Sequence, residues 1–140
     1  VNPPDLLPHA RGAFVGLDLG HDGTDLAYAV QEGVAHILRR NVDSFDGARE
    51  IVSTGGGSAS AHWTQLKADA CWLDVLVPDE AEATCRGAAA LALVASGDLA
   101  SIADADALGL PEVRRFVPRD RRVHDERYRL FDDAVRRLLH

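Results

Sequence analysis

The residues best suited to chemistry lie in one glycine-rich segment, Thr54-Gly55-Gly56-Gly57-Ser58-Ala59-Ser60. A short β-prone run, Arg49–Ser53, precedes it, and helical periodicity follows over Ser58–Ala70. Where a strand turns into a helix, unpaired backbone N–H groups point outward, and glycines let a ligand approach the backbone closely. Nucleotide-binding turns have this form, and the candidate residues for such a turn here are Gly55, Gly56, Gly57, Ser58 and Ser60.

The spacing of these glycines excludes two common nucleotide motifs. No Gly-Lys-Ser or Gly-Lys-Thr follows, as a P-loop requires, and the spacing differs from the G-x-G-x-x-G of dinucleotide-binding turns. A serine nucleophile at Ser58 or Ser60 is not favoured, because neither serine lies in G-x-S-x-G and no histidine–acid pair is tied to it. From the glycines alone, a flexible turn that binds nothing is the favoured interpretation, and a nucleotide-binding turn is the alternative.

A second segment, Phe14 to Thr24, resembles the D-x-G-T phosphate loop of actin-like ATPases. That loop joins two strands of a hairpin, whereas His21-Asp22 displaces the Gly and Thr here and helical periodicity follows. We therefore predict no phosphate loop. Asp18, His21, Asp22 and Asp25 also offer metal-ligand chemistry, but capping and solvated carboxylates at a helix start explain them better.

Two histidines and two tryptophans lie close to this turn in the sequence or on the preceding helix. His36 falls on or beside the apolar face of that helix, and His62 falls in the first turn of the next one. We expect packing or surface roles for both before a role as a general base. Trp63 and Trp72 are expected in the core, with an aromatic wall for a purine as the alternative.

Hydrophobic periodicity predicts the elements that position the turn. A helix should run from Thr24 to about residues 39–41, with Asp22 or Thr24 as its N-cap. Further elements are expected along the chain: a mostly buried strand over Cys71–Val77 closed by Pro78, an alanine-rich helix over Glu80–Ser96 capped by Gly97, and an irregular stretch over residues 98–120.

The last segment, Arg121–His140, is predicted to be a charged amphipathic helix. Acid–arginine pairs at i,i+4 spacing should contribute roughly 0.3 kcal/mol each; they are Asp125–Arg129, Asp132–Arg136 and Asp133–Arg137. The buried stripe is expected to hold Val123, Leu130, Phe131, Ala134, Val135 and Leu138.

Composition favours one globular domain over residues 1–140, with 46% hydrophobic residues and a net charge of −7. No run approaches the ~20 apolar residues of a membrane span, and no signal peptide is evident, so a cytoplasmic protein without a membrane partner is expected. The chain has no methionine and begins with Val1, which indicates a processed chain or a part of a longer one.

The acidic balance also argues against nucleic acid as a partner. Binding to a phosphate backbone would need a local basic patch, and the candidate arginines alternate with acidic residues. Cys71 and Cys85 have no C-x-x-C spacing and no clustered histidines, so two buried thiols are expected and a zinc site is not. The candidate arginines for a nucleic-acid-binding patch are Arg114, Arg115, Arg119, Arg121 and Arg122.

Three ordered stretches carry a family pattern. They are Phe14–Leu17 leading through His21 into Ala29–Ala35 and Leu38-Arg39; Thr54–Asp69, similar to T-G-G-G-A…S-x-L-W-x-Q-I-x-A-D; and Glu82–Ala90, similar to E-A-T-A-L-G-A-A. Together they resemble the C-terminal domain of the FGGY carbohydrate kinases, in particular the xylulokinase-like members. Order and spacing agree over about residues 12–97.

The resemblance implies an α/β fold, the actin-like ATPase (ribonuclease H-like) C-terminal domain, present in part and helix-rich around a small sheet. Such kinases hold ATP with Mg²⁺ between two domains and a sugar in the cleft. The glycine turn would then place Gly55, Gly56 and Gly57 against the nucleotide, with Ser60 facing the adenine. The family's phosphate-loop hairpin, catalytic Asp and most sugar contacts have no match here, so no catalytic residue is assigned.

The resemblance predicts the ATP-binding portion of a carbohydrate kinase that transfers the γ-phosphoryl group of ATP to a sugar hydroxyl, on a xylulose-like pentulose or related polyol. Its partners would be ATP or ADP, the sugar and a missing N-terminal domain, and a homodimer stays compatible with the sequence. This chain alone should be inactive. The alternatives are a non-catalytic nucleotide-binding or interaction module derived from a sugar kinase, and a structural domain whose turn binds nothing.

Overall fold

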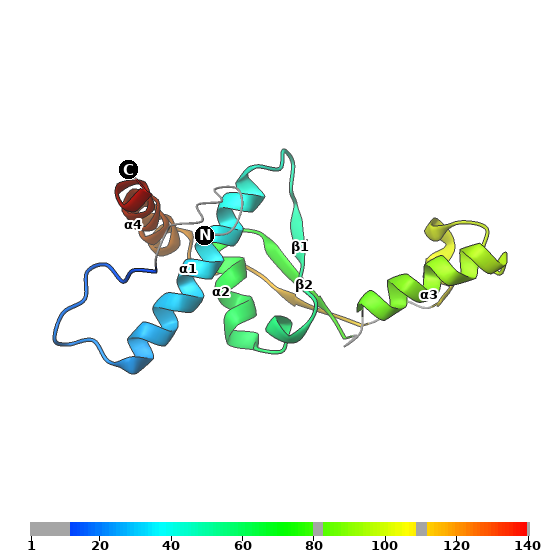
Figure 1. Cartoon of the computed structure of the whole chain (residues 1–140), viewed down its shortest axis with the longest axis horizontal. Helices are drawn as coiled ribbons and strands as arrows, with labels where there is room; N and C mark the ends of the chain where they lie inside the picture. Colours follow the sequence, from blue (N-terminus) through cyan, green and yellow to red (C-terminus); the bar gives the residue numbers. More distant parts are fainter. Residues whose placement is uncertain (1–11, 80–82, 109–111, 140) are drawn as a thin grey trace.

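The computed structural model describes residues 12–79, 83–108 and 112–139, in which helices outnumber strands (Figure 1). The elements in chain order are α1 (Gly23–Asp43), β1 (Glu50–Val52), the 3₁₀ turn η1 (Gly56–Ser58), α2 (Ala61–Cys71), β2 (Asp74–Pro78), α3 (Ala83–Ser96), the 3₁₀ segment η2 (Ile102–Leu108), β3 (Val113–Phe116) and α4 (Arg121–Leu139). None of these described helices combines the length and apolar character needed to cross a membrane.

A three-stranded sheet of order β1-β2-β3 lies at the centre. β1 and β2 are parallel, with Ile51 opposite Val75, and α2 forms the crossover between them. β2 and β3 are antiparallel, with Val75 opposite Phe116. Because Val75 and Val77 are buried and alternate with half-buried neighbours, β2 presents one apolar face to the core.

The core has two small clusters that meet at α2. One joins Ala35 of α1 to Leu66 and Ala70 of α2, and the other joins Ala68 of α2 to Val75 and Val77 of β2. Alternate residues of α2 thus face the helix on one side and the sheet on the other. This packing of α2 fixes where the glycine-rich turn before it emerges.

The first helix begins as the sequence predicts. Asp22 accepts hydrogen bonds from the backbone N–H groups of Thr24 and Asp25, and the Asp25 side chain accepts from Asp22 N in return. This reciprocal capping box pairs three backbone donors, and it lowers the pKa of Asp22, first through the backbone hydrogen bond from Thr24. α1 continues to Asp43, a little beyond the predicted end.

Two expectations for the strands are wrong. Cys71 ends α2 instead of starting a strand, because Trp72 adopts a left-handed conformation (φ 53°) that stops the helix, and β2 begins only at Asp74. The stretch expected to be irregular contains β3, whose Val113 and Arg114 are exposed. The sequence of such a strand gives little apolar signal, because the strand forms through its pairing with β2.

The last helix is present as predicted, but its buried face differs. Val123 and Leu130 are exposed, whereas His124 is buried and Tyr128 and Phe131 are partly buried against α1. The expected stripe was wrong at these two positions because polar residues take part in the packing of α4 on α1. The predicted position Leu138 has a side chain outside the described part of the structure.

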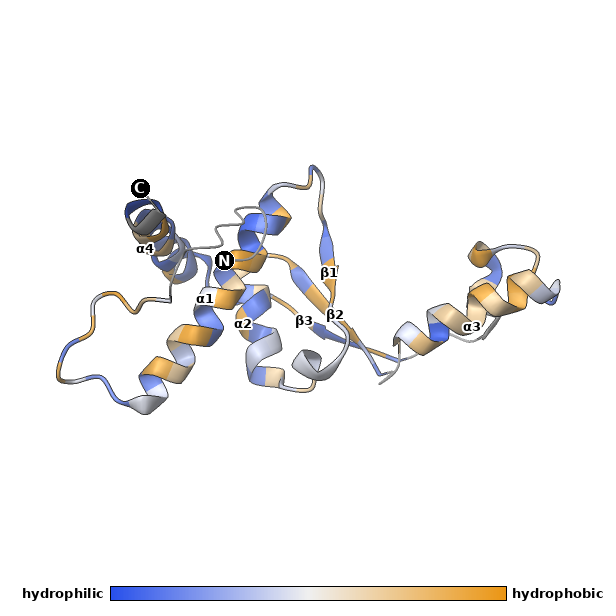
Figure 2. Ribbon diagram, viewed as in Figure 1, coloured by the Kyte–Doolittle hydropathy of each residue, from blue (hydrophilic) through white to orange (hydrophobic). Residues whose placement is uncertain are grey.

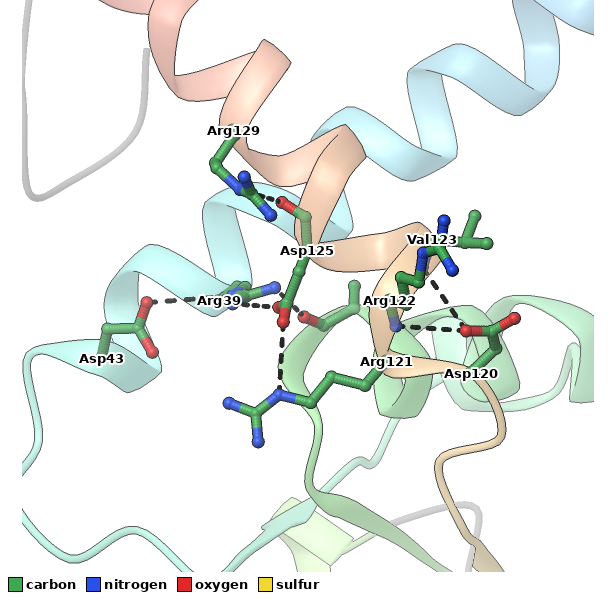
Figure 3. Close-up of polar contacts among 9 residues, drawn as sticks. Arg39, Asp43, Asp120, Arg121, Arg122, Val123, Asp125 and Arg129 are labelled. Atoms are coloured by element: carbon green, nitrogen blue, oxygen red, sulfur yellow. Dashed lines mark hydrogen bonds and ion pairs between the residues drawn. The ribbon is translucent and has the colours of Figure 1, made fainter.

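Among the predicted ion pairs of α4, Asp132–Arg136 forms, with 2.8 Å between Asp132 Oδ2 and Arg136 Nε. Asp125 pairs instead with Arg39 of α1, 2.7 Å away, while Arg129 donates to the Asp125 backbone oxygen (Figure 3). Within the described residues, no ion pair joins residues 133 and 137. A tertiary partner has replaced a local one at Asp125.

α3 and η2 lie apart from the rest of the molecule and contact mainly each other (Figure 1). Gly97 caps α3 as predicted, with φ 86° and Asp98 N donating to Leu93 O. The apolar colouring of α3 extends over much of a solvent-facing helix, and Leu91 is 63% exposed (Figure 2). Cys85 on this helix is also exposed, so the expectation of two buried thiols is correct only for Cys71.

Candidate functional site

The glycine-rich turn leaves the sheet at the carboxyl end of β1 and enters α2. Ser53 N donates to Leu76 O at 2.8 Å, which anchors the start of the turn to β2. The chain then forms η1, closed by hydrogen bonds from Ser58 N to Gly55 O (3.0 Å) and from Ala59 N to Gly56 O (3.3 Å). The predicted transition from strand through glycines to helix is therefore confirmed.

The three glycines meet different surroundings. Gly55 has φ +79°, a backbone conformation that side chains other than glycine rarely adopt. At Gly56 an added Cβ would meet nothing within 4 Å, whereas at Gly57 it would lie 3.2 Å from the Trp63 ring. Open space therefore lies beside both Gly55 and Gly56, and of the two only Gly56 lacks a positive φ, while Gly57 allows the turn to pack on Trp63.

The backbone N–H groups of the three glycines are free. Within the described part of the chain, no hydrogen bond uses the N–H of Gly55, Gly56 or Gly57. Unpaired N–H groups carry positive partial charge, and the N-terminus of α2 adds to it. The arrangement can hold an anionic oxygen without any charged side chain.

Both serine candidates direct their hydroxyls at the backbone. Ser58 is buried and its Oγ donates to Gly55 O at 2.7 Å, so it stabilises η1. Ser60 Oγ accepts from Trp63 N at 3.3 Å and is the N-cap of α2. In these contacts both hydroxyls stabilise the local backbone, Ser58 in η1 and Ser60 at the start of α2.

A tryptophan and a lysine lie behind the turn. Lys67 Nζ is 4.6 Å from the centre of the Trp63 ring and 3.3 Å from Ser53 Oγ. Burial lowers the pKa of Lys67. Sequence reasoning missed this residue, although Ser60, Trp63 and Lys67 share the i, i+3, i+7 spacing of one helix face and Lys67 is the one lysine of the chain.

The two tryptophans differ in burial. Trp63 is partly buried and packs on the cluster of Ala35, Leu66 and Ala70, in agreement with a core role. Trp72 is 36% exposed, so the expectation of a core position is wrong there. The left-handed backbone at Trp72 turns its ring outward, where the Arg121 guanidinium lies 5.7 Å from the ring centre.

His36 has a packing role, as expected. It is 2% exposed, between the rings of Tyr128 at 5.5 Å and Phe131 at 5.2 Å. Burial lowers the pKa of His36 to about 4, so the ring is neutral at neutral pH. His62 is exposed, with its ring 6.0 Å from that of Tyr28. These positions do not bring a histidine to the serines of the turn.

The acidic segment before α1 acts as a cap. Asp18 Oδ1 lies 3.0 Å from His21 Nδ1, and Asp22 and Asp25 form the capping box. Among residues 12–79, 83–108 and 112–139, no group of three or more His, Cys, Asp or Glu side chains could hold a metal ion.

Two hollows lie away from the turn. One of about 490 Å³ lies between α1 and α4, with His36, Leu130 and Phe131 in its lining. Another of about 340 Å³ has His62 and Asp69 in its lining. Neither has a glycine of the turn in its lining, and Gly55 and Gly56 are exposed to solvent.

Residues 1–96 match the FGGY family of carbohydrate kinases, C-terminal domain. The chain is 30% identical over 142 residues to xylulose kinase from Bacillus subtilis, across 96% of this chain and 28% of that protein. It is 33% identical over 99 residues to gluconokinase from the same organism, across 67% of this chain and 19% of that protein.

Solved structures show the same likeness. The crystal structure of xylulose kinase from Rhodospirillum rubrum superposes with a TM-score of 0.79 at 28% sequence identity, over 94% of this chain and 28% of the other. The chain thus spans less than a third of the length of these relatives.

Proposed function

The chain belongs to the FGGY family of carbohydrate kinases, and from this premise we propose that it is the ATP-binding portion of an ATP-dependent sugar kinase. Its fold is part of the actin-like ATPase fold of those kinases, helix-rich around a small sheet. We propose a xylulose-like pentulose or related polyol as acceptor because xylulose kinases are among its relatives.

The free N–H groups of Gly55, Gly56 and Gly57 carry the proposal. They lie at the carboxyl end of β1, where nucleotides bind in parallel α/β sheets, and open space faces Gly56. In our proposal a nucleotide phosphate accepts hydrogen bonds from these groups, Ser58 braces the turn, and Ser60 lies beside the adenine. Bound ATP with Mg²⁺ would supply the phosphoryl group.

In this proposal, the chain positions the nucleotide and does not perform the transfer. Phosphoryl transfer depends on placing the acceptor hydroxyl in line with the phosphate and on neutralising charge. The open turn suits a site that a second domain covers, and the chain spans 28% of the xylulose kinase of Bacillus subtilis. We therefore propose the missing N-terminal domain as its partner, and expect nucleotide binding without turnover from this chain by itself.

Replacing Gly56 by Val tests the site. We expect calorimetric titration with ATP and ADP to detect binding to the wild-type chain and at least a tenfold loss in Gly56→Val, because the side chain would occupy the space of the ligand. The fold should survive, since an added Cβ meets no atom within 4 Å. Far-UV circular dichroism would monitor the helices.

The matched control is Gly87→Val on α3, where an added Cβ also meets nothing within 4 Å. This variant should bind ATP like the wild type. Equal affinity in Gly56→Val and the wild type would contradict the assignment of the turn, and no heat at millimolar nucleotide with a folded wild-type chain would contradict nucleotide binding itself.

A further inference from the structure

The ammonium group of Lys67 lies directly behind the glycine turn. Its Nζ is 3.3 Å from the hydroxyl of Ser53, where the turn begins, and 3.8 Å from the point where a Cβ of Gly57 would lie. The Trp63 ring, 4.6 Å away, supports it from the side of α2. Lys67 is therefore held at both ends of the segment 53–57 and not extended into solvent.

This cation has no acidic partner within the described residues. Other basic side chains that pack inside the molecule are paired, as Arg39 is with Asp125 and Arg127 with Glu32. The contacts of Lys67 are a neutral hydroxyl and the face of an aromatic ring. A half-buried ammonium without a counter-charge favours an anion nearby, because desolvation is otherwise uncompensated.

The turn offers the place for such an anion. The free N–H groups of Gly55, Gly56 and Gly57 and the N-terminus of α2 give positive partial charge in front of the backbone, and Lys67 adds a full charge behind it. Because the ammonium lies this close to Ser53 and Gly57, its electrostatic effect reaches an anion held at the turn. The two features attract the same kind of group.

We propose that Lys67 determines specificity in the nucleotide site, by attracting the phosphate held at residues 53–57 and so favouring nucleoside di- and triphosphates over nucleosides. This inference rests on the proposed function. Arginine keeps the positive charge of Lys67, although not its compact shape. Lys67→Arg should therefore retain more of the attraction for phosphate than a neutral side chain of similar length. Adenosine, which has no phosphate, should not sense the change.

The experiment compares wild type, Lys67→Met and Lys67→Arg by calorimetric titration with ADP, ATP and adenosine. We expect Lys67→Met to weaken ADP and ATP binding about tenfold, as for loss of one charge-assisted contact, while adenosine binding changes less than twofold. The dependence of ADP affinity on salt should also become shallower. Arg122→Met, which removes a charge from the exposed start of α4, is the control and should behave as wild type.

The outcomes separate the two proposals. Unchanged affinities for both ADP and adenosine in Lys67→Met, with the wild type binding both, overturn the role of Lys67 and leave the nucleotide site intact. Equal losses for ADP and adenosine also overturn it, since they indicate that Lys67 only supports the packing of Trp63. A folded wild type that binds neither ADP nor ATP overturns the proposed function and this inference with it.

Discussion

His36 shows how one buried side chain makes stability depend on pH. Neither ring nitrogen has a hydrogen-bond partner within the described residues, and burial lowers its pKa to about 4 from an ordinary value near 6.5. The charged groups that act on it are Glu32, which favours the protonated ring, and His124, Arg39 and Arg127, which oppose it. The folded protein therefore holds the neutral ring.

The pH dependence follows from this shift. Between pH 6.5 and 4 the unfolded chain binds a proton at His36 that the folded chain does not, so the free energy of unfolding should fall as pH falls, by on the order of 2 kcal/mol. Guanidinium denaturation at pH 7 and 5 would measure the effect. His36→Phe should flatten the slope, because phenylalanine fills the space between Tyr128 and Phe131 without titrating.

The exposed His62 gives a matched control, and His62→Gln should keep the slope of the wild type. A slope that is the same in His36→Phe and the wild type would contradict the assignment to His36. In that case the carboxylates that share the packing of α4, such as Asp125, would have to account for the change.

Some residue roles could be predicted from local sequence and others could not. Asp22 was a predictable cap because a cap contacts backbone groups only two and three residues away. The burial of Cys71 and the exposure of Cys85 depend on what packs against each helix, so their shared residue type predicted the same burial for both. The position of Lys67 behind the turn likewise depends on the fold of β1 against α2.

Arg39 joins three helices. Its guanidinium is 2.7 Å from Asp125 of α4, donates to Ala70 O of α2 at 3.2 Å, and stacks 4.2 Å from the centre of the Tyr128 ring (Figure 3). The pair also lowers the pKa of Asp125, first through the hydrogen bond from Arg39. Because the Arg39 side chain is 15% exposed, solvent screens this pair less than a surface pair.

Arg39→Met should destabilise the protein by about 2 kcal/mol, because it leaves the carbonyl oxygen of Ala70 without this donor and Asp125 with only Arg121. Arg39→Lys should recover only part of the loss. It keeps the positive charge, but an ammonium cannot reproduce the planar guanidinium that donates to Asp125 and Ala70 O at the same time. Chemical denaturation followed by circular dichroism measures both. The exposed Arg122→Met should change stability by less than about 0.5 kcal/mol, and a similar loss in that control would contradict a specific role for Arg39.

The helices were more predictable than the strands. α1, α2 and α4 carry their apolar spacing and caps within their own residues, so periodicity located them closely. β3 was missed because its stability comes from hydrogen bonds to β2, about 40 residues away along the chain. The same reason applies to Asp125, whose local partner Arg129 was displaced by the distant Arg39.

At the scale of the whole molecule, α3 and η2 form an arm separate from the core (Figure 1). The arm starts and ends at neighbouring points, since Pro78 pairs with Val113 and Asp79 N donates to Glu112 O at 2.6 Å. In the described residues, the main contact of α3 is with η2.

Removing residues 80–111 and joining Asp79 to Glu112 through Asn-Gly should leave the core folded, because Asn-Gly suits a tight antiparallel turn. We expect cooperative guanidinium unfolding with a free energy within about 1 kcal/mol of the wild type, since a shorter loop costs less entropy. Tryptophan fluorescence can follow it, as Trp63 and Trp72 lie outside the excised segment. Loss of the cooperative transition would show that the arm stabilises the core.

The sequence by itself determined the family, the glycine turn, and the helices with their caps, because these depend on residue types within a few positions of one another. Only the tertiary structure decided the third strand, the pairing of Arg39 with Asp125 and the place of Lys67 behind the turn. Each of these joins residues from separate elements, and their contacts exist only after α2 has packed between α1 and the sheet.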